Sequence, residues 1–147
     1  MAHVEFTVFG KPAQMGSKRA FVRGNRAILT DDNSKQRKQW ANAVSAAAAE
    51  AMNGAELFSG PVCVECVFMF SRPKSHFGTG RNAGVQKDSA PALHSQSPDL
   101  DKLVRCLLDA MSSIVYVDDR QVWQMEAQRQ WTRRQAGAVV KVKHYER

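Results

Sequence analysis

The order of hydrophobic periods along this chain constrains its fold more than any other sequence feature. Apolar and polar residues alternate over residues 4–8 and 138–145, near the two ends, which predicts a strand in each place. Between them, residues 34–52 and 100–114 carry apolar residues at helical spacing, and the alternating apolar residues of 62–70 predict a further strand. Strands around two helices predict an α+β fold, in which two main helices pack on one side of a mixed β-sheet.

The segment before the last strand also has the period of a strand. Its apolar face consists of Trp123, Met125, Ala127 and Trp131. We expect the two tryptophans to lie in the core or in a dimer interface rather than to stack on nucleobases. A turn over residues 132–137 then predicts an antiparallel hairpin between this strand and the last one. With 147 residues, of which 44% are hydrophobic, the chain can bury the core of one domain, and we expect residues 1–147 to form it.

Three features predict where the protein resides. The longest apolar stretch, residues 62–70, is interrupted by Glu65 and is about half the ~18 residues that a membrane helix needs. No export signal is visible at the start of the sequence. The three cysteines are an odd number, which suits a reducing compartment. We therefore expect a cytoplasmic protein without membrane contact, from a bacterial or phage-infected cell.

Cys63 and Cys66 have the spacing of a metal-binding pair but lie within a predicted strand. Residues three apart in a strand point to opposite faces of the sheet, so these two thiols could not share a metal ion. We interpret them as small core residues.

The charge of the chain predicts a polyanionic partner. Its net charge is +7, and residues 11–38 alone, with eight basic residues against two aspartates, carry +6 and predict a basic hairpin. Residues 71–98 lack a sustained period and predict a flexible basic loop of the kind that carries function. Basic side chains bind nucleic acid through its phosphates, which fixes position without reading sequence. The candidate DNA-binding residues are Lys18, Arg19, Arg23, Arg26, Arg72, Lys74, His76 and His94.

The alternative is that these basic side chains are merely solvated. For His94, the alternative is a surface histidine that contacts neither phosphate nor metal.

One segment reverses this charge. Residues 99–119 contain five aspartates and two cations, a net charge of −3. Clustered carboxylates would repel a polyanion unless a divalent cation lay between them, and carboxylate oxygens are the ligands that Mg²⁺ prefers. Asp99 and Asp101 can converge if Asp99 precedes the second helix as its N-cap, which Pro98 favours. The alternative is that Asp99 and Asp101 only cap the helix and that Asp118 and Asp119 only form a polar turn.

The same segment carries a family resemblance. Residues 98–103 (PDLDKL), 107–111 (LLDAM) and 115–122 (VYVDDRQV) together resemble the signature of the RusA-type Holliday-junction resolvases. Weaker similarity extends to residues 9–12 (FGKP) and 72–76 (RPKSH). The resemblance implies a homodimeric endodeoxyribonuclease that binds four-way DNA junctions. It also implies that the enzyme cuts two strands symmetrically with Mg²⁺, or with Mn²⁺ in its place.

The resemblance also implies roles for individual residues. The family's metal ligands, which are also catalytic, fall on Asp99, Asp101 and Asp119. Asp118 is implied as an auxiliary group, and we interpret Asp109, two turns beyond Asp101, as structural. Where the family has a catalytic lysine, this chain has Arg105, which lies one helical turn after Asp101 and cannot exchange a proton near neutral pH.

If the family's lysine stabilises charge, Arg105 can replace it. If that lysine is an acid or base, this protein should be slow or should use Lys102 or metal-bound water instead.

Two other functions remain open from the sequence. A nuclease of the same fold that trims flaps or other branches would share every residue named above. A non-catalytic nucleic-acid-binding protein would use the basic segments alone, with its aspartates as caps and turns. The biological setting implied is recombination, repair or phage DNA processing.

Overall fold

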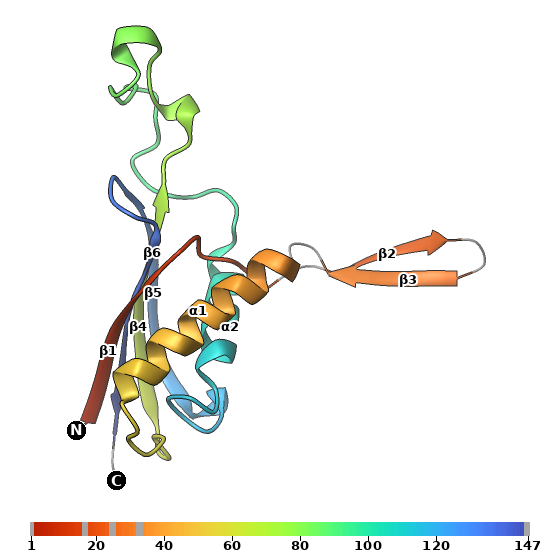
Figure 1. The fold of residues 1–147 in the computed structure, drawn as a ribbon, viewed down its shortest axis with the longest axis vertical. Helices are drawn as coiled ribbons and strands as arrows, with labels where there is room; N and C mark the ends of the chain where they lie inside the picture. Colours follow the sequence, from red (N-terminus) through yellow and green to blue (C-terminus); the bar gives the residue numbers. More distant parts are fainter. Residues whose placement is uncertain (1, 16–17, 24–25, 32–33, 146–147) are drawn as a thin grey trace.

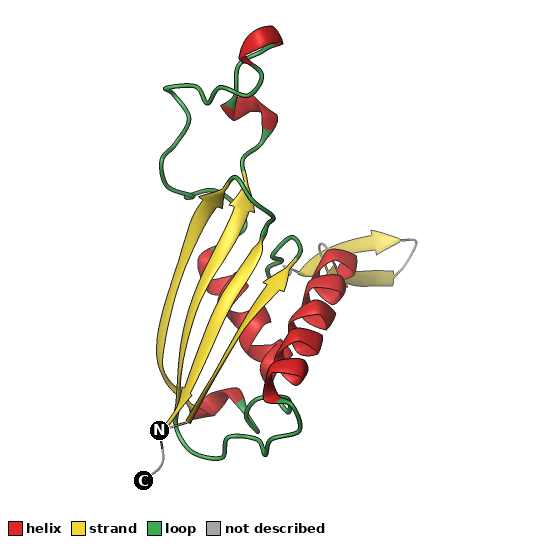
Figure 2. Cartoon of the chain, turned by 60° about the vertical axis from the view of Figure 1, so that its left-hand side comes forward, coloured by secondary structure: helices red, strands yellow, loops and turns green. Residues whose placement is uncertain are grey.

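The computed structural model describes residues 2–15, 18–23, 26–31 and 34–145, and only the backbone of 18–23 and 26–31. Within these residues the chain forms one mixed four-stranded sheet with two helices on one face, and a separate two-stranded ribbon (Figures 1 and 2). The strands are β1 (Ala2–Phe9), β2 (Lys18–Arg23), β3 (Arg26–Asp31), β4 (Val62–Ser71), β5 (Val122–Thr132) and β6 (Gly137–His144). The helices are α1 (Ser34–Met52), α2 (Leu100–Met111) and the short η1 (Lys74–His76), η2 (Gly80–Asn82) and η3 (Asp119–Gln121). The predicted α+β class is confirmed.

The sheet has the order β1-β6-β4-β5, so the predicted hairpin of the last two strands is wrong. β6 pairs antiparallel with both β1 and β4, and Val142 faces Val4 on one side and Val64 on the other. β5 pairs in parallel with β4 instead. The physical reason lies in side-chain polarity: Ala138 and Val140 of β6 are fully buried, which suits an interior strand, whereas β5 exposes a glutamine or glutamate at every second residue.

The two helices cover the face of the sheet to which alternate β4 side chains point. Val64 and Phe68 of β4 lie in the same buried cluster as Val44 of α1 and Leu107 of α2. α2 buries one stripe of apolar side chains, as its period predicts. It ends at Met111 rather than at residue 114, because the chain turns there through a residue of positive φ, Ser113 (+66°).

The cysteines and tryptophans test the predicted faces of β4 and β5. Cys63 and Cys66 are buried free thiols, which confirms their interpretation as core residues. Trp131 packs against the core, but Trp123 is 60% exposed. The register between β4 and β5 shifts beside Trp123, since Val62 pairs with Val122 and the next residue, Cys63, pairs with Gln124. This irregularity separates Trp123 from the apolar face on which it was predicted.

The two basic segments leave the body of the molecule in different directions (Figure 1). β2 and β3 form the predicted hairpin, with Lys18 opposite Asp31. The segment between β4 and α2 contains no element longer than the short η1 and η2. Its two arms are tied by a hydrogen bond from Arg72 Nη1 to the Pro91 carbonyl (2.7 Å) and by one from the Lys87 amide to the His76 carbonyl (2.8 Å). None of the helices described here is long and apolar enough to cross a membrane.

Candidate active site

Asp99 stands at the N-cap of α2, with the extended backbone that this position requires (φ −68°, ψ 138°). Its amide donates to Gln14 Oε1 (2.9 Å), and its carbonyl accepts from Leu103 N (3.0 Å). Its carboxylate makes no capping hydrogen bond; the side chain is 60% exposed and lies 3.7 Å from Lys102 Nζ. The Asp99 side chain therefore does not cap the helix, and its carboxylate remains exposed beside Lys102.

The chain around Asp99 is held by residues that the sequence analysis missed. Arg129 of β5 donates from Nη1 to the carbonyls of Gln96 and Pro98 (both 2.8 Å), which fixes the residues just before Asp99. On the other side, the Met15 amide donates to the Lys102 carbonyl (3.1 Å). One signal in the sequence could have revealed Arg129: it is a cation at an inward position of β5, among apolar side chains.

Asp101 and Arg105 lie on one side of α2, where they line an open groove between α2 and β5. The groove has a volume of about 650 Å³, and its other lining residues are Leu100, Val104, Met125 and Ala127. The predicted proximity of Arg105 to Asp101 is therefore present, and both side chains are exposed. A guanidinium at this place can stabilise negative charge but cannot donate or accept a proton in a reaction.

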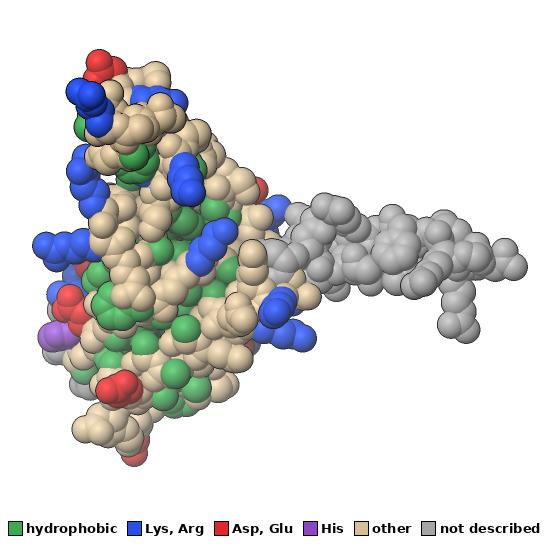
Figure 3. Space-filling view, turned by 45° about the horizontal axis from the view of Figure 1, so that its top comes forward, with side chains coloured by type: hydrophobic (Ala, Val, Ile, Leu, Met, Phe, Trp, Pro, Cys, Tyr) green, Lys and Arg blue, Asp and Glu red, His purple; other side chains and the backbone are tan. Residues whose placement is uncertain are grey.

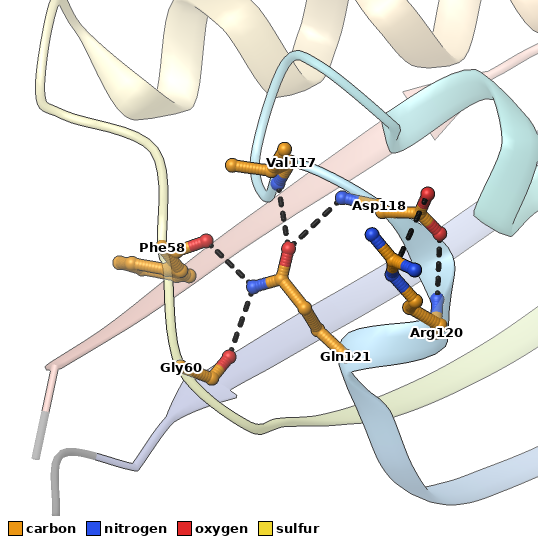
Figure 4. A network of polar contacts seen from close by, with 6 residues as sticks. All are labelled: Phe58, Gly60, Val117, Asp118, Arg120 and Gln121. Carbon is orange, nitrogen blue, oxygen red and sulfur yellow. Dashed lines mark hydrogen bonds and ion pairs between the residues drawn. The ribbon is translucent and has the colours of Figure 1, made fainter.

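Asp118 and Asp119 lie in the turn that precedes β5 (Figure 4). Asp118 is the N-cap of η3 and accepts a hydrogen bond from the Arg120 amide (3.0 Å). Gln121 closes the turn: its Oε1 accepts from the amides of Val117 and Asp118 (both 2.9 Å). Its Nε2 donates to the carbonyls of Phe58 (2.7 Å) and Gly60 (2.9 Å) in the segment before β4, as Figure 4 shows. This glutamine was also missed from sequence.

The two adjacent carboxyls have opposite pKa shifts. The hydrogen bond from the Arg120 amide lowers the pKa of Asp118. Burial raises the pKa of Asp119, and a hydrogen bond with Asp118 and repulsion by Asp118 and Asp109 raise it further. Ser112, the C-cap of α2, forms an isolated β-bridge with Tyr116, which brings the start of this turn to the C-terminal end of that helix. The Tyr116 hydroxyl, which donates to the Leu108 carbonyl (2.7 Å), ties the same turn to the same end.

The acidic residues are therefore divided between the two ends of α2. Asp99 is the N-cap, Asp101 lies in the first turn, and Asp119 lies beside the last turn. A helix of this length spans about 18 Å, far more than the reach of ligands around one ion. Among the described residues, no three histidine, cysteine or acidic side chains lie close enough together to hold a metal ion. The structure thus places Asp99 and Asp101 at the N-terminal end of α2 and Asp119 at its C-terminal end within a single chain.

The candidate DNA-binding residues have mixed environments. Lys18, Arg19, Arg23 and Arg26 lie on β2 and β3, where the described structure does not include side chains. In the loop, Lys74 is exposed, whereas the Arg72 guanidinium lies over the Trp131 ring (5.0 Å) and within 3.3 Å of His76 Nδ1. Figure 3 shows Lys and Arg side chains spread over one face of the molecule.

His94 is not the surface histidine that was expected. Its side chain is only 6% exposed, because the chain after the loop folds back against the ends of β4 and β5. Its ring stacks on Phe70 (4.4 Å between centroids) and lies 4.5 Å from Trp131. Burial lowers the pKa of the imidazole, and the nearby Arg129 guanidinium lowers it further.

Two comparisons relate this chain to known proteins. The chain is 27% identical over 120 residues to a protein of Bacillus subtilis (strain 168) described as "Uncharacterized protein YqaN", and the alignment covers 81% of each chain. The profile of the family described as "Endodeoxyribonuclease RusA" matches residues 10–143, which include both groups of aspartates and both basic segments. The family implies endonuclease activity of the Holliday-junction-resolvase type and binding of branched DNA. With nearly its whole length matched, this chain belongs to the RusA endodeoxyribonuclease family.

Proposed function

We propose that two copies of this chain form an Mg²⁺-dependent endodeoxyribonuclease that resolves four-way DNA junctions by two symmetric cuts. Given the family, one observation supports this proposal: the aspartates that would bind the metal lie at opposite ends of α2. No single chain completes the site, but a pair of chains could. The setting would be recombination, repair or phage DNA processing in the cytoplasm.

In a dimer with a two-fold axis, the partner subunit would provide the ligand that is missing at the N-terminal end of α2. If α2 of one chain packs antiparallel to α2 of its partner, the N-terminal end of each helix meets the C-terminal end of the other. The groove between α2 and β5 offers a surface for this contact, because Val104 and Met125 line it and exposed Trp123 lies near the start of β5. A second copy is the occupant that this surface favours. Each end of α2 would then receive from the partner the metal ligand that it lacks in a single chain.

In this arrangement Asp99 and Asp101 of one chain, together with Asp119 of the partner subunit, would hold the metal ion. Mg²⁺ bound there, or Mn²⁺ in its place, would polarise the phosphoryl group of the scissile bond and favour attack by water. Arg105 stabilises the negative charge that develops on the phosphate, and Lys102 keeps the Asp99 carboxylate oriented. Two identical sites related by the axis match the two cuts that a junction requires.

The basic segments would hold the DNA around these sites. The hairpin carries Lys18, Arg19, Arg23 and Arg26, and the loop presents Lys74 to solvent. Arg72 and His76 support the loop through their contacts with Pro91 and Trp131 and could contact phosphate at its surface. The buried His94 would not reach a phosphate at the surface.

The test is cleavage of a labelled synthetic four-way junction, with linear duplex and flap substrates as controls, in Mg²⁺ or EDTA. We expect paired symmetric nicks in the junction alone, which EDTA abolishes and Asp101→Asn lowers by at least a hundredfold. Asp88→Asn is the matched control, because Asp88 is an exposed loop aspartate outside both acidic groups. Equal cutting of flaps or duplex would identify a broader branch nuclease. Binding without cutting would identify a non-catalytic binding protein.

A further inference from the structure

Gly60, in the segment before β4, is held on two sides by side chains that are distant in sequence. Its carbonyl accepts from Gln121 Nε2 (2.9 Å), the contact that ties it to the acidic turn (Figure 4). Its amide donates to Nε2 of His144 (3.0 Å), which stands at the end of β6, 84 residues further along the chain. Gly60 therefore connects the end of β6 to the turn that carries Asp119.

The end of β6 holds this segment at two further places. The His144 ring is stacked on the Phe58 ring, with centroids 4.8 Å apart and ring planes 8° from parallel. The Tyr145 amide donates to the Pro61 carbonyl (2.9 Å). The Phe58 carbonyl accepts from Gln121 Nε2, as the Gly60 carbonyl does. Both carbonyls that receive the Gln121 amide group thus belong to a segment that the end of β6 holds.

This arrangement requires glycine at position 60. A Cβ there would lie 3.0 Å from His144 Nε2 and 3.0 Å from the Tyr145 carbonyl oxygen, so the imidazole or the strand end would have to shift. Without a side chain, the backbone of Gly60 can approach the imidazole closely enough for the hydrogen bond.

We propose that His144 is a positioning residue for Asp119. By accepting from the Gly60 amide, it fixes the carbonyls to which Gln121 donates, and Gln121 in turn fixes the Val117 and Asp118 amides next to Asp119. The inference rests on the proposed function, in which Asp119 is a metal ligand. Groups that orient a metal ligand change the metal affinity by about 10–100-fold when they are removed.

Two substitutions separate the acceptor of His144 from its ring. His144→Phe keeps a ring to stack on Phe58 but has no acceptor. His144→Gln has no ring, but its Oε1 is an acceptor at the same number of bonds from Cα as Nε2. We expect the Mn²⁺ affinity of the full chain, measured by electron paramagnetic resonance, to fall about tenfold in His144→Phe and to stay within about twofold of the wild type in His144→Gln. Equal losses, or the reverse order, would overturn the proposal, because packing of the ring would then explain the effect.

Two further variants complete this set. His3→Phe is the matched control, because His3 is an exposed histidine on β1, which pairs with β6. It should leave Mn²⁺ affinity unchanged. His144→Met has the length of glutamine without its acceptor, so it should behave as His144→Phe does, and it replaces that variant if circular dichroism shows that His144→Phe does not fold.

An Asp119→Asn background shows whether the effect passes through Asp119. There, His144→Phe should cause no further loss of Mn²⁺ affinity, because the ligand that it positions is already removed. The same fold-loss in both backgrounds would overturn the proposal.

Hydrogen exchange of the backbone amides, in EDTA, gives a readout that needs neither metal nor DNA. We expect His144→Phe to speed exchange about tenfold at Gly60 and also at Val117 and Asp118, with exchange at Val140 in the interior strand β6 unchanged. Faster exchange at Gly60 alone would show that the contact acts only locally and would contradict the proposal.

The two hypotheses fail in different ways. A wild-type chain that neither binds Mn²⁺ nor cuts junctions contradicts the proposed function, and the positioning role falls with it. A wild-type chain that binds Mn²⁺ and cuts junctions, with the same Mn²⁺ affinity in His144→Phe, contradicts the positioning role alone.

Discussion

At the scale of single residues, Gln121 determines where the Asp118–Asp119 turn lies. Its amide makes four hydrogen bonds that join the turn to the segment before β4. In Gln121→Leu these backbone groups lose their partner, and we expect the free energy of unfolding to fall by about 1–3 kcal/mol, as measured by urea denaturation. Gln124→Leu, which changes an exposed glutamine three residues on, should have little effect. Equal losses in the two variants would contradict the role of the network.

The buried thiols give a second prediction at this scale. Burial raises the pKa of Cys66 to about 12 and of Cys106 to about 11, and it also raises the pKa of Cys63. The thiolate is the reactive form, so we expect the native chain at pH 8 to react very slowly with a thiol reagent. In guanidinium all three thiols should react quickly. Fast labelling of even one thiol in the native protein would show that its part of the core opens readily.

At the scale of the elements, the close pairing of β1 and β6 depends on Gly137. A Cβ at this position would overlap the carbonyl oxygen of Val8, which is backbone and cannot move aside without disturbing the strand pair. We expect Gly137→Ala to lower the free energy of unfolding by about 1–3 kcal/mol. Gly84→Ala is the control, since a Cβ there meets no neighbour within 4 Å. A shift in the urea midpoint for the first variant alone would confirm the prediction.

The elements themselves could largely be predicted from the sequence, because each is coded by a local period. The helical period of α2 and the alternation of apolar residues in β4 indicate which side of each element is buried, and they do so from the local sequence alone. The order of strands could not be predicted in this way. β5 and β6 are adjacent in sequence and separated in the sheet, since the choice of neighbour depends on how all strands share the buried positions.

The candidate site shows the same limit. Asp99 at the N-cap and Arg105 one turn beyond Asp101 follow from helical geometry. The distance between Asp101 and Asp119 does not, because it depends on where the chain turns after Met111. His94 was expected at the surface because it lies in the predicted loop, yet long-range packing against Phe70 and Trp131 buries it. Arg129 and Gln121 act through backbone carbonyls and amides, which no side-chain motif reveals.

At the scale of the whole molecule, the proposed sharing of ligands between two chains makes a prediction about mixed dimers. Asp101→Asn and Asp119→Asn should each inactivate both sites of a homodimer. In a heterodimer of the two variants, one site would carry both substitutions and the other would carry neither. Random association makes half of the dimers heterodimers, so we expect about a quarter of the wild-type sites to recover after co-refolding, measured as single nicks in the junction.

A matched mixture tests whether this recovery arises from shared ligands. Asp99→Asn and Asp101→Asn change the same end of α2, so every site in their mixed dimer would retain one substitution. That mixture should stay inactive, whereas the mixture of Asp101→Asn with Asp119→Asn recovers nicking. Recovery in neither mixture, with wild-type chains refolding to full activity, would mean that one chain supplies all three ligands. The turn that carries Asp119 would then have to move the length of α2 when DNA or metal binds.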